Sequence, residues 1–163
     1  MRIRRAALGS ALFFALAPGV VAGLVPWWLT RWRPSPAPLA VRLAGAALVL
    51  VAVPSLVRLF VRFVLDGFGT PAPVAPTERL VTTGAYRYVR NPMYLAVLAT
   101  ILGQALLLGQ PVLVAYAGGV AAMFVIWVRL YEEPVLRQQF GAEYEAYRRA
   151  VPAWWPRLRP WKG

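Results

Sequence analysis

Two short clusters, residues 90–94 and 131–134, hold the side chains of this chain that are best suited to chemistry. The first reads Arg-Asn-Pro-Met-Tyr and the second reads Tyr-Glu-Glu-Pro. A guanidinium group, two carboxylates and two tyrosines in one place can hold a ligand that carries both signs of charge and can move a proton. The clusters are separated by a long apolar stretch with a single break at Gly109-Gln110-Pro111.

That apolar stretch predicts a helical hairpin in a membrane. At about 1.5 Å per residue, residues 93–108 and 111–128 are each long enough to cross most or all of a hydrocarbon core about 30 Å thick. Because a hairpin returns to the side from which it started, both clusters are expected at the same membrane face. Ionisable groups are costly there, which makes them functional candidates.

The composition also indicates an all-α membrane protein. The chain of 163 residues is 60% hydrophobic with a mean hydropathy of +0.56, against about 45–50% for soluble domains. Two further apolar runs, 6–29 and 39–65, bring the expected number of transmembrane helices to about four. The first run begins like a signal peptide but continues well past a signal core, so it is expected to be a retained span. Whether the second run is one long span or a broken pair stays open, because Pro54 lies within it.

The basic residues are distributed asymmetrically along the chain. The net charge is +12, and fifteen of the eighteen basic residues lie before the first run, in 58–90 or in 129–162. The other three, Arg31, Arg33 and Arg42, lie near the first connection. The positive-inside rule then places both termini and both clusters in the cytoplasm. Membrane lipids are the expected partners of the surplus charge, and nucleic acid is not.

The absence of Cys and His narrows the chemistry. It excludes disulfides, thiolate ligands, cysteine nucleophiles and histidine bases, and no metal site is expected. Acid–base work is left to six carboxylates, seven tyrosines and one lysine.

One membrane domain, residues 1–163, is expected to position the two clusters. Its parts are two N-terminal spans (1–65), a cytoplasmic loop rich in Gly and Pro (66–92), the hairpin (93–131), and an interfacial helix with its tail (132–163). The loop should end in a short helix near Asn91, with Pro92 in the first turn of the next helix. Residues 134–149 predict an amphipathic interfacial helix whose apolar stripe is Leu136, Phe140, Tyr144 and Tyr147.

Several charged residues near the clusters allow both a structural and a functional interpretation. Arg58 and Arg62, four residues apart, either extend to the membrane surface or face the site. Arg129 can form an ordinary intrahelical ion pair with Glu132 or Glu133. Adjacent residues on a helix point about 100° apart, so at most one of these two carboxylates is expected to point straight into a shared cavity.

Four segments of the chain resemble one enzyme family. Residues 69–73, 80–94, 131–134 and 140–147 resemble isoprenylcysteine carboxyl methyltransferases, and their order and separation are specific in combination. The Asn-Pro-Met-Tyr and Tyr-Glu-Glu-Pro portions are also similar to phospholipid N-methyltransferases. The resemblance covers the C-terminal part of the chain, while residues 1–65 match only as generic spans.

The resemblance implies an integral-membrane methyltransferase that uses S-adenosylmethionine at the cytoplasmic face. It also implies that the cofactor pocket is lined by Arg90, Asn91, Pro92, Tyr94, Glu132 and Glu133. Many carboxyl methyltransferases carry His where this chain has Asn91, whereas phospholipid methyltransferases can carry Asn. The acceptor therefore stays open between an isoprenylcysteine-like carboxylate and a phospholipid or other lipid amine.

The charges of the cofactor match these side chains. Arg90 suits its carboxylate, while Glu132 or Glu133 together with Tyr94 suits its positive centres. For an amine acceptor, a proton would leave to Glu132, Glu133 or a tyrosinate at Tyr86. For a carboxylate acceptor, Arg87 or Arg58 would hold the acceptor instead. The expected catalytic residues are thus Glu133, Arg87 and Tyr86.

Two other functions stay open at this point. A membrane reductase with a nicotinamide cofactor would use basic residues such as Arg87, Arg148 and Arg149 for phosphates. A non-catalytic membrane scaffold would use Arg129, Glu132 and Glu133 as a structural ion pair. The sequence does not determine the oligomeric state.

Overall fold

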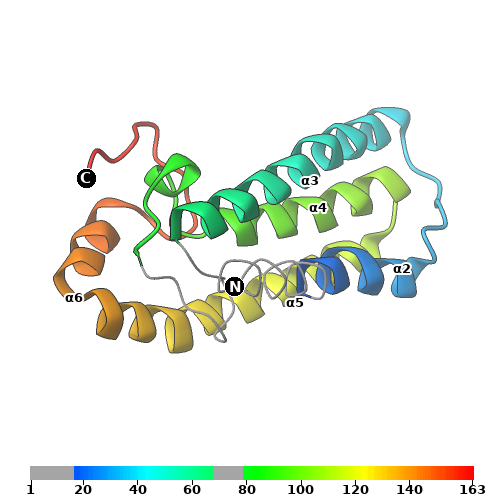
Figure 1. Ribbon diagram of the computed structural model, residues 1–163. Coiled ribbons are helices and arrows are strands. Elements are labelled where there is room, and N and C mark those ends of the chain that lie inside the picture. The colour runs from blue at the N-terminus through cyan, green and yellow to red at the C-terminus, as the bar shows by residue number, and fades with distance from the viewer. Residues whose placement is uncertain (1–16, 68–78) are drawn as a thin grey trace, which may run out of the picture.

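The computed structural model describes residues 17–67 and 79–163, and these form a bundle of helices without strands (Figure 1). The prediction of an all-α fold is confirmed for these residues; residues 6–16 of the first apolar run lie outside them. The elements are η1 (Val20–Leu24), α2 (Val25–Thr30), α3 (Leu39–Gly67), η2 (Gly84–Arg87), α4 (Pro92–Leu108), α5 (Pro111–Trp127), η3 (Val128–Glu132) and α6 (Glu133–Ala150).

Two of the described helices are long and apolar enough to cross a membrane. They are Leu39–Phe63 and the helical stretch Pro111–Ala150, which joins α5, η3 and α6, with mean hydropathies of 2.2 and 2.0 in their most apolar windows. Ala17–Thr30 and Pro92–Leu108 are shorter apolar helices. The expected count of about four spans is therefore not established by length alone.

Helix α3 is a single helix that continues through Pro54. The sequence left open whether this run is one long helix or a broken pair, and the structure shows one helix. Leu43, Leu50 and Val57 are exposed along α3. Exposed apolar side chains in such a row are expected on a lipid-facing surface.

Helices α3 and α4 lie side by side and touch through glycines (Figure 1). A Cβ atom on Gly45 would lie 2.3 Å from the backbone nitrogen of Leu107, and one on Gly103 would lie 2.7 Å from Cγ2 of Val49. Small residues allow this close approach of helix backbones in membrane proteins. The contact fixes α4 against the long helix α3.

Helices α4 and α5 form the predicted hairpin. Gly109 ends α4 at a φ of +62°, and Pro111 occupies the first turn of α5. Glycine adopts this left-handed conformation without strain, and proline lacks only an N–H that would have no partner there. A Cβ on Gly109 would also lie 2.8 Å from Cβ of Ala37. The turn therefore needs glycine for its conformation and for its contact with the loop before α3.

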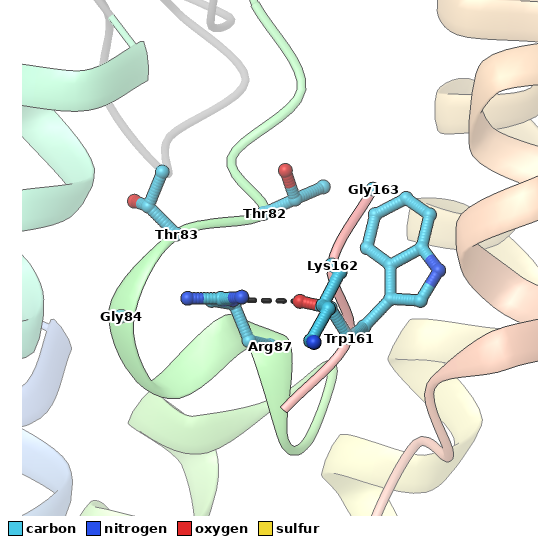
Figure 2. Close-up of a pocket in the computed structure, with 7 residues that line it drawn as sticks. All are labelled: Thr82, Thr83, Gly84, Arg87, Trp161, Lys162 and Gly163. Carbon is cyan, nitrogen blue, oxygen red and sulfur yellow. Dashed lines mark hydrogen bonds between the residues drawn. The ribbon is translucent and has the colours of Figure 1, made fainter. Parts of the chain in front are cut away.

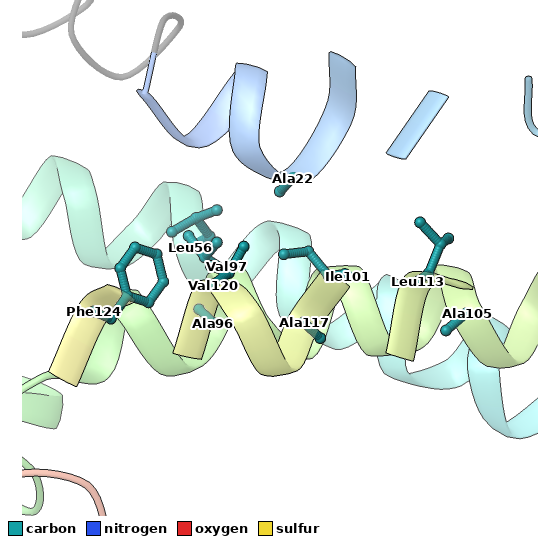
Figure 3. Close-up of a cluster of buried hydrophobic side chains, with 10 residues drawn as sticks. All are labelled: Ala22, Leu56, Ala96, Val97, Ile101, Ala105, Leu113, Ala117, Val120 and Phe124. Atoms are coloured by element: carbon teal, nitrogen blue, oxygen red, sulfur yellow. The ribbon is translucent and has the colours of Figure 1, made fainter. Parts of the chain in front are cut away.

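The main hydrophobic core lies along this hairpin (Figure 3). Ile101 and Leu113 are fully buried in it, and Leu56 of α3 and Ala22 of η1 complete it. The buried members of the core are Ala22, Leu56, Ala96, Val97, Ile101, Ala105, Leu113, Ala117, Val120 and Phe124.

Helix α6 follows α5 and carries the predicted apolar stripe. Tyr144, Tyr147 and Val151 are buried, and Leu136 and Phe140 pack against them, so the stripe packs against other parts of the chain. Gly141 breaks the helical conformation at φ 51° and ψ −122°, which the sequence analysis did not predict. The break turns the second half of α6 towards the tail and η2 (Figure 1).

Candidate functional site

The two polar clusters meet at one end of the α4–α5 hairpin, as predicted. Nη1 of Arg90 donates a hydrogen bond to Oε1 of Glu133 at 2.7 Å, and the hydroxyl group of Tyr94 donates one to Glu132. Arg90 lies just before α4 and Tyr94 lies in its first turn. The hairpin therefore gives each carboxylate its own partner from the segment 90–94.

A π turn, η3, carries the chain from α5 to the two carboxylates. Single π turns inside α-helices occur frequently at functional sites. Glu132 is the last residue of η3 and also accepts a hydrogen bond from Nε1 of Trp127 at 3.1 Å, and Glu133 begins α6. Both carboxylates contact the first cluster, Glu133 through Arg90 and Glu132 through Tyr94. That at most one of them points straight into a shared cavity stays a prediction.

Arg90 is the centre of the polar contacts. Its Nε donates to the carbonyl oxygen of Val151 at 2.9 Å, and its Nη1 donates to the hydroxyl oxygen of Tyr144 at 3.0 Å as well as to Glu133. The side chains of Arg90 and Glu133 are only 12% and 13% exposed. A pair this deeply buried is costly to desolvate, and removing one partner leaves an uncompensated charge.

Glu133 has further cations around it, but Arg129 is not one of them. Within the described part of the chain, its other ion pairs are to Arg148 at 3.7 Å and to Arg137 at 3.8 Å. The predicted intrahelical pair between Arg129 and the carboxylates is therefore wrong. Glu133 is bound instead by a residue 43 positions earlier in the chain, which joins the start of α4 to the start of α6.

The segment after α6 holds residues 86–91 in place. The backbone N–H of Arg90 donates to Pro152 O at 2.9 Å, and the side-chain amide of Asn91 donates to Ala153 O at 3.1 Å. Asn91 is thus bound by the tail, and Pro92 begins α4. Both residues shape the segment rather than contact the carboxylates.

Aromatic rings form a wall beside Tyr94. Its ring centroid lies 4.4 Å from that of Phe124 on α5 and 6.3 Å from that of Trp154 in the tail. Trp127 stacks on Tyr131 with centroids 4.5 Å apart. Aromatic faces attract cations, so this side of the site can accept a positively charged group.

Tyr86 lies in η2 with its side chain buried against Phe63, and the two ring centroids are 5.8 Å apart. Its hydroxyl oxygen is buried and has no hydrogen-bond partner among the described residues. Burial raises the pKa of this hydroxyl well above its ordinary value, and charge on Tyr147 and Glu132 acts in the same direction. The raised pKa opposes the tyrosinate role expected for Tyr86.

The side chain of Arg87 points away from the carboxylates of Glu132 and Glu133. Its Nε donates to the carbonyl oxygen of Trp161 at 2.6 Å, and its side chain lines a separate cavity of about 260 Å³ (Figure 2). The structure therefore brings Arg90, Tyr94, Glu132 and Glu133 together, with Tyr86 close by, and leaves Arg87 apart. Arg58 is exposed on α3.

Sequence reasoning missed several residues that complete the site. Tyr144 was assigned to packing, yet its hydroxyl also binds Arg90, and the helical stripe gave no signal of that. Trp127 and Trp154 were not associated with the site, and the carbonyl of Val151 carries no residue-type signal at all. Among residues 17–67 and 79–163, no group of three or more His, Cys, Asp or Glu side chains is placed to hold a metal ion.

Comparison with known proteins gives one family. The family model described as phospholipid methyltransferase matches residues 41–143, more than half of the chain. That match includes α4, α5, η3 and the first half of α6.

Individual relatives match a shorter part of the chain than the family model does. A probable protein-S-isoprenylcysteine O-methyltransferase of Oryza sativa subsp. indica is 38% identical over 79 residues, which are 45% of this chain and 39% of the rice protein. The protein-S-isoprenylcysteine O-methyltransferase of Schizosaccharomyces pombe is 39% identical over 74 residues, 45% of this chain and 31% of the yeast protein. The alignments thus span well under half the length of these relatives, and no solved structure matches the chain significantly.

Proposed function

The chain belongs to the phospholipid methyltransferase family, and from that premise we propose that it is an integral-membrane methyltransferase that uses S-adenosylmethionine. The observation that carries the proposal is the meeting of Arg90 and Tyr94 with Glu133 and Glu132. Those four residues are the proposed cofactor site, with Asn91 and Pro92 shaping the segment that carries two of them.

The charges of the site fit the amino-acid end of this cofactor. Arg90 would bind its carboxylate, and Glu133 would bind its ammonium group. Arg90 and Glu133 neutralise each other in the structure. A ligand that carries one charge of each sign can replace both halves of that pair without leaving a buried charge unpaired.

The other side chains of the site fit the sulfonium end of the cofactor. Glu132 and the rings of Tyr94 and Trp154 offer negative charge and aromatic faces to a sulfonium centre. The buried hydroxyl of Tyr86 has no partner among the described residues, and such a group is costly unless a ligand satisfies it. When bound, the cofactor supplies a methyl group on a positively charged sulfur.

The protein's contribution to the reaction would be alignment and exclusion of water. Methyl transfer from a sulfonium creates no new negative charge on the leaving group, so orientation in a dry site supplies most of the catalysis. We propose a lipophilic acceptor, either an isoprenylcysteine-like carboxylate or a lipid amine. For an amine, Glu132 or Glu133 would take the proton, because burial opposes this role for Tyr86.

For the topology, we propose four spans in one membrane domain, with both termini and the site on the cytoplasmic side. Arg87, Arg148 and Arg157 are among the cations at the end that carries the site, as the positive-inside rule requires. The chain contains no cysteine, so single cysteines can report the two sides. Leu158→Cys should react with a membrane-impermeant maleimide only after the cells are permeabilised, and Pro36→Cys should react in intact cells.

Transfer of a labelled methyl group tests the proposed activity. Purified full-length protein would be supplied with methyl-labelled S-adenosylmethionine and either membrane lipids or prenylated thiols, and label should enter one of the two classes. A parallel titration with a reduced nicotinamide nucleotide tests the reductase. Binding of that nucleotide alone would favour the reductase, and binding of neither ligand to folded protein would favour the scaffold.

A further inference from the structure

A cavity lies beside η2, between the turn before it and the tail. It has a volume of about 260 Å³ and is lined by Thr82, Thr83, Gly84, Arg87, Trp161, Lys162 and Gly163. Figure 2 shows the guanidinium group of Arg87 between the turn at 82–84 and the tail. The lining thus comes from two segments that are far apart in the sequence.

Hydrogen bonds hold the two walls of this cavity together. The Nε of Arg87 donates to Trp161 O at 2.6 Å, and the backbone N–H of Trp161 donates to Arg87 O at 3.0 Å. The ring of Trp161 packs against Tyr147, with centroids 5.4 Å apart. Among the described residues, the side chain of Arg87 uses only its Nε in these contacts, so its two terminal nitrogens can bind a ligand.

The charges around the cavity are mainly positive. Arg87 and Lys162 line it, and Nη1 of Arg62 lies 3.8 Å from the position that a Cβ on Gly84 would occupy. Among the described residues, an acidic side chain near the cavity is that of Asp66, which accepts a hydrogen bond from the hydroxyl of Thr83. The three cationic side chains outnumber this carboxylate and that of Gly163 in the lining, and the excess of positive charge favours an anion.

The size of the cavity limits what it can hold. Pockets that enclose a whole small molecule measure about 300–1,000 Å³, so about 260 Å³ fits a head group better than a nucleoside. Arginine suits the oxygens of a phosphate, which it can bind with two parallel N–H groups. The proposed topology places the cavity at the cytoplasmic leaflet, where anionic phospholipids are concentrated.

We propose that this cavity binds the phosphate group of an anionic phospholipid, through Arg87 and Lys162 with Arg62 beside them. The bound lipid would secure the tail against η2 and so support the segment that carries Arg90. The proposal rests on the membrane location proposed above but does not depend on methyl transfer.

Binding of a soluble short-chain lipid tests the proposal. Full-length protein in phosphate-free maltoside detergent would be titrated with dihexanoyl phosphatidylglycerol, and in a separate arm with inorganic phosphate. We expect saturable binding of the lipid, and a dissociation constant about tenfold or more weaker in the double variant Arg87→Gln, Lys162→Gln. Lys162→Gln alone should also weaken binding while leaving the Arg87–Trp161 bond in place.

Arg159→Gln is the matched control, because it removes an exposed charge from the same tail without changing the lining. It should change the dissociation constant by less than about twofold. Equal loss in this control would show that only net charge matters and would overturn the proposal. Unchanged lipid binding in the folded double variant, or equally tight binding of inorganic phosphate, would overturn it as well.

Discussion

Helix α4 has two ends of opposite character. At its start, Arg90 and Tyr94 form buried polar contacts with Glu133 and Glu132, and the nearby hydroxyl of Tyr86 has no partner among the described residues. At its other end, Gly103 and Leu107 pack tightly against α3.

The difference indicates which end carries the function. Buried charges and an unsatisfied hydroxyl cost stability, and proteins accept such costs mainly at functional sites. At the far end of α4, glycines allow close packing against α3, as expected of a scaffold. Nε of Arg42, three residues before Gly45, is also buried without a partner among the described residues, so the buried ion pair of Arg90 and Glu133 is what sets the start of α4 apart.

Arg90→Leu should have the largest effect on stability. It leaves the buried carboxylate of Glu133 without its closest cation and the carbonyl of Val151 without its donor, which should lower the free energy of unfolding by about 3–5 kcal/mol. Arg129→Leu is the control, because Arg129 is exposed on the neighbouring turn, and its unfolding curve in detergent should match that of the wild type. Equal unfolding curves for the Arg90 variant and the wild type would contradict the described network.

Gly45→Ala should disrupt the packing of α3 against the other end of α4. Its Cβ would lie 2.3 Å from the backbone of Leu107, so α3 and α4 must separate, and overpacking of this kind costs about 1–3 kcal/mol. Gly118→Ala, whose Cβ meets nothing within 4 Å, should instead stabilise its helix by about 0.5–1 kcal/mol. Thermal unfolding in detergent measures both, and a shift of the same sign in the two variants would contradict the tight contact.

Two tyrosine variants should have smaller effects on the free energy of unfolding, and only one of them should lower it. The hydroxyl of Tyr147 donates to Tyr86 O at 2.7 Å, so Tyr147→Phe should cost about 0.5–1.5 kcal/mol. Tyr86→Phe removes a hydroxyl without a described partner, so it should leave the stability of the ligand-free protein equal or higher. It should also weaken cofactor binding, and destabilisation together with unchanged binding would show that the hydroxyl serves packing alone.

The sequence predicted the helices better than it predicted the site. Pro92, Pro111 and Gly109 mark helix ends by local rules, so the hairpin and the meeting of the clusters followed from them. Two breaks did not follow, the π turn at Val128–Glu132 and the bend at Gly141. The bend lies at a glycine, which adopts its φ of 51° without strain, but a glycine within a helical pattern does not by itself predict a bend, and the residues of the π turn follow no pattern that marks it.

The partners of Arg90 and Arg87 were equally hard to predict. Arg90 binds the carbonyl of Val151, and Arg87 binds that of Trp161, and every residue has a carbonyl group. The adjacent positions 86 and 87 also point to different sides of η2, Tyr86 towards Phe63 and Arg87 into the separate cavity. Sequence proximity alone had grouped these two side chains at one site.

Calorimetric titration with S-adenosylmethionine decides whether Glu133 and its partners form the proposed cofactor pocket. Glu133→Gln keeps the shape of the side chain and an oxygen that can accept from Arg90, so the protein should be less stable, because the charge of Arg90 loses its closest counter-ion, but should stay folded and lose measurable binding. Glu143→Gln removes an exposed carboxylate from the same helix and should bind as the wild type does. Equal binding by the wild type and both folded variants would contradict the assignment of the pocket.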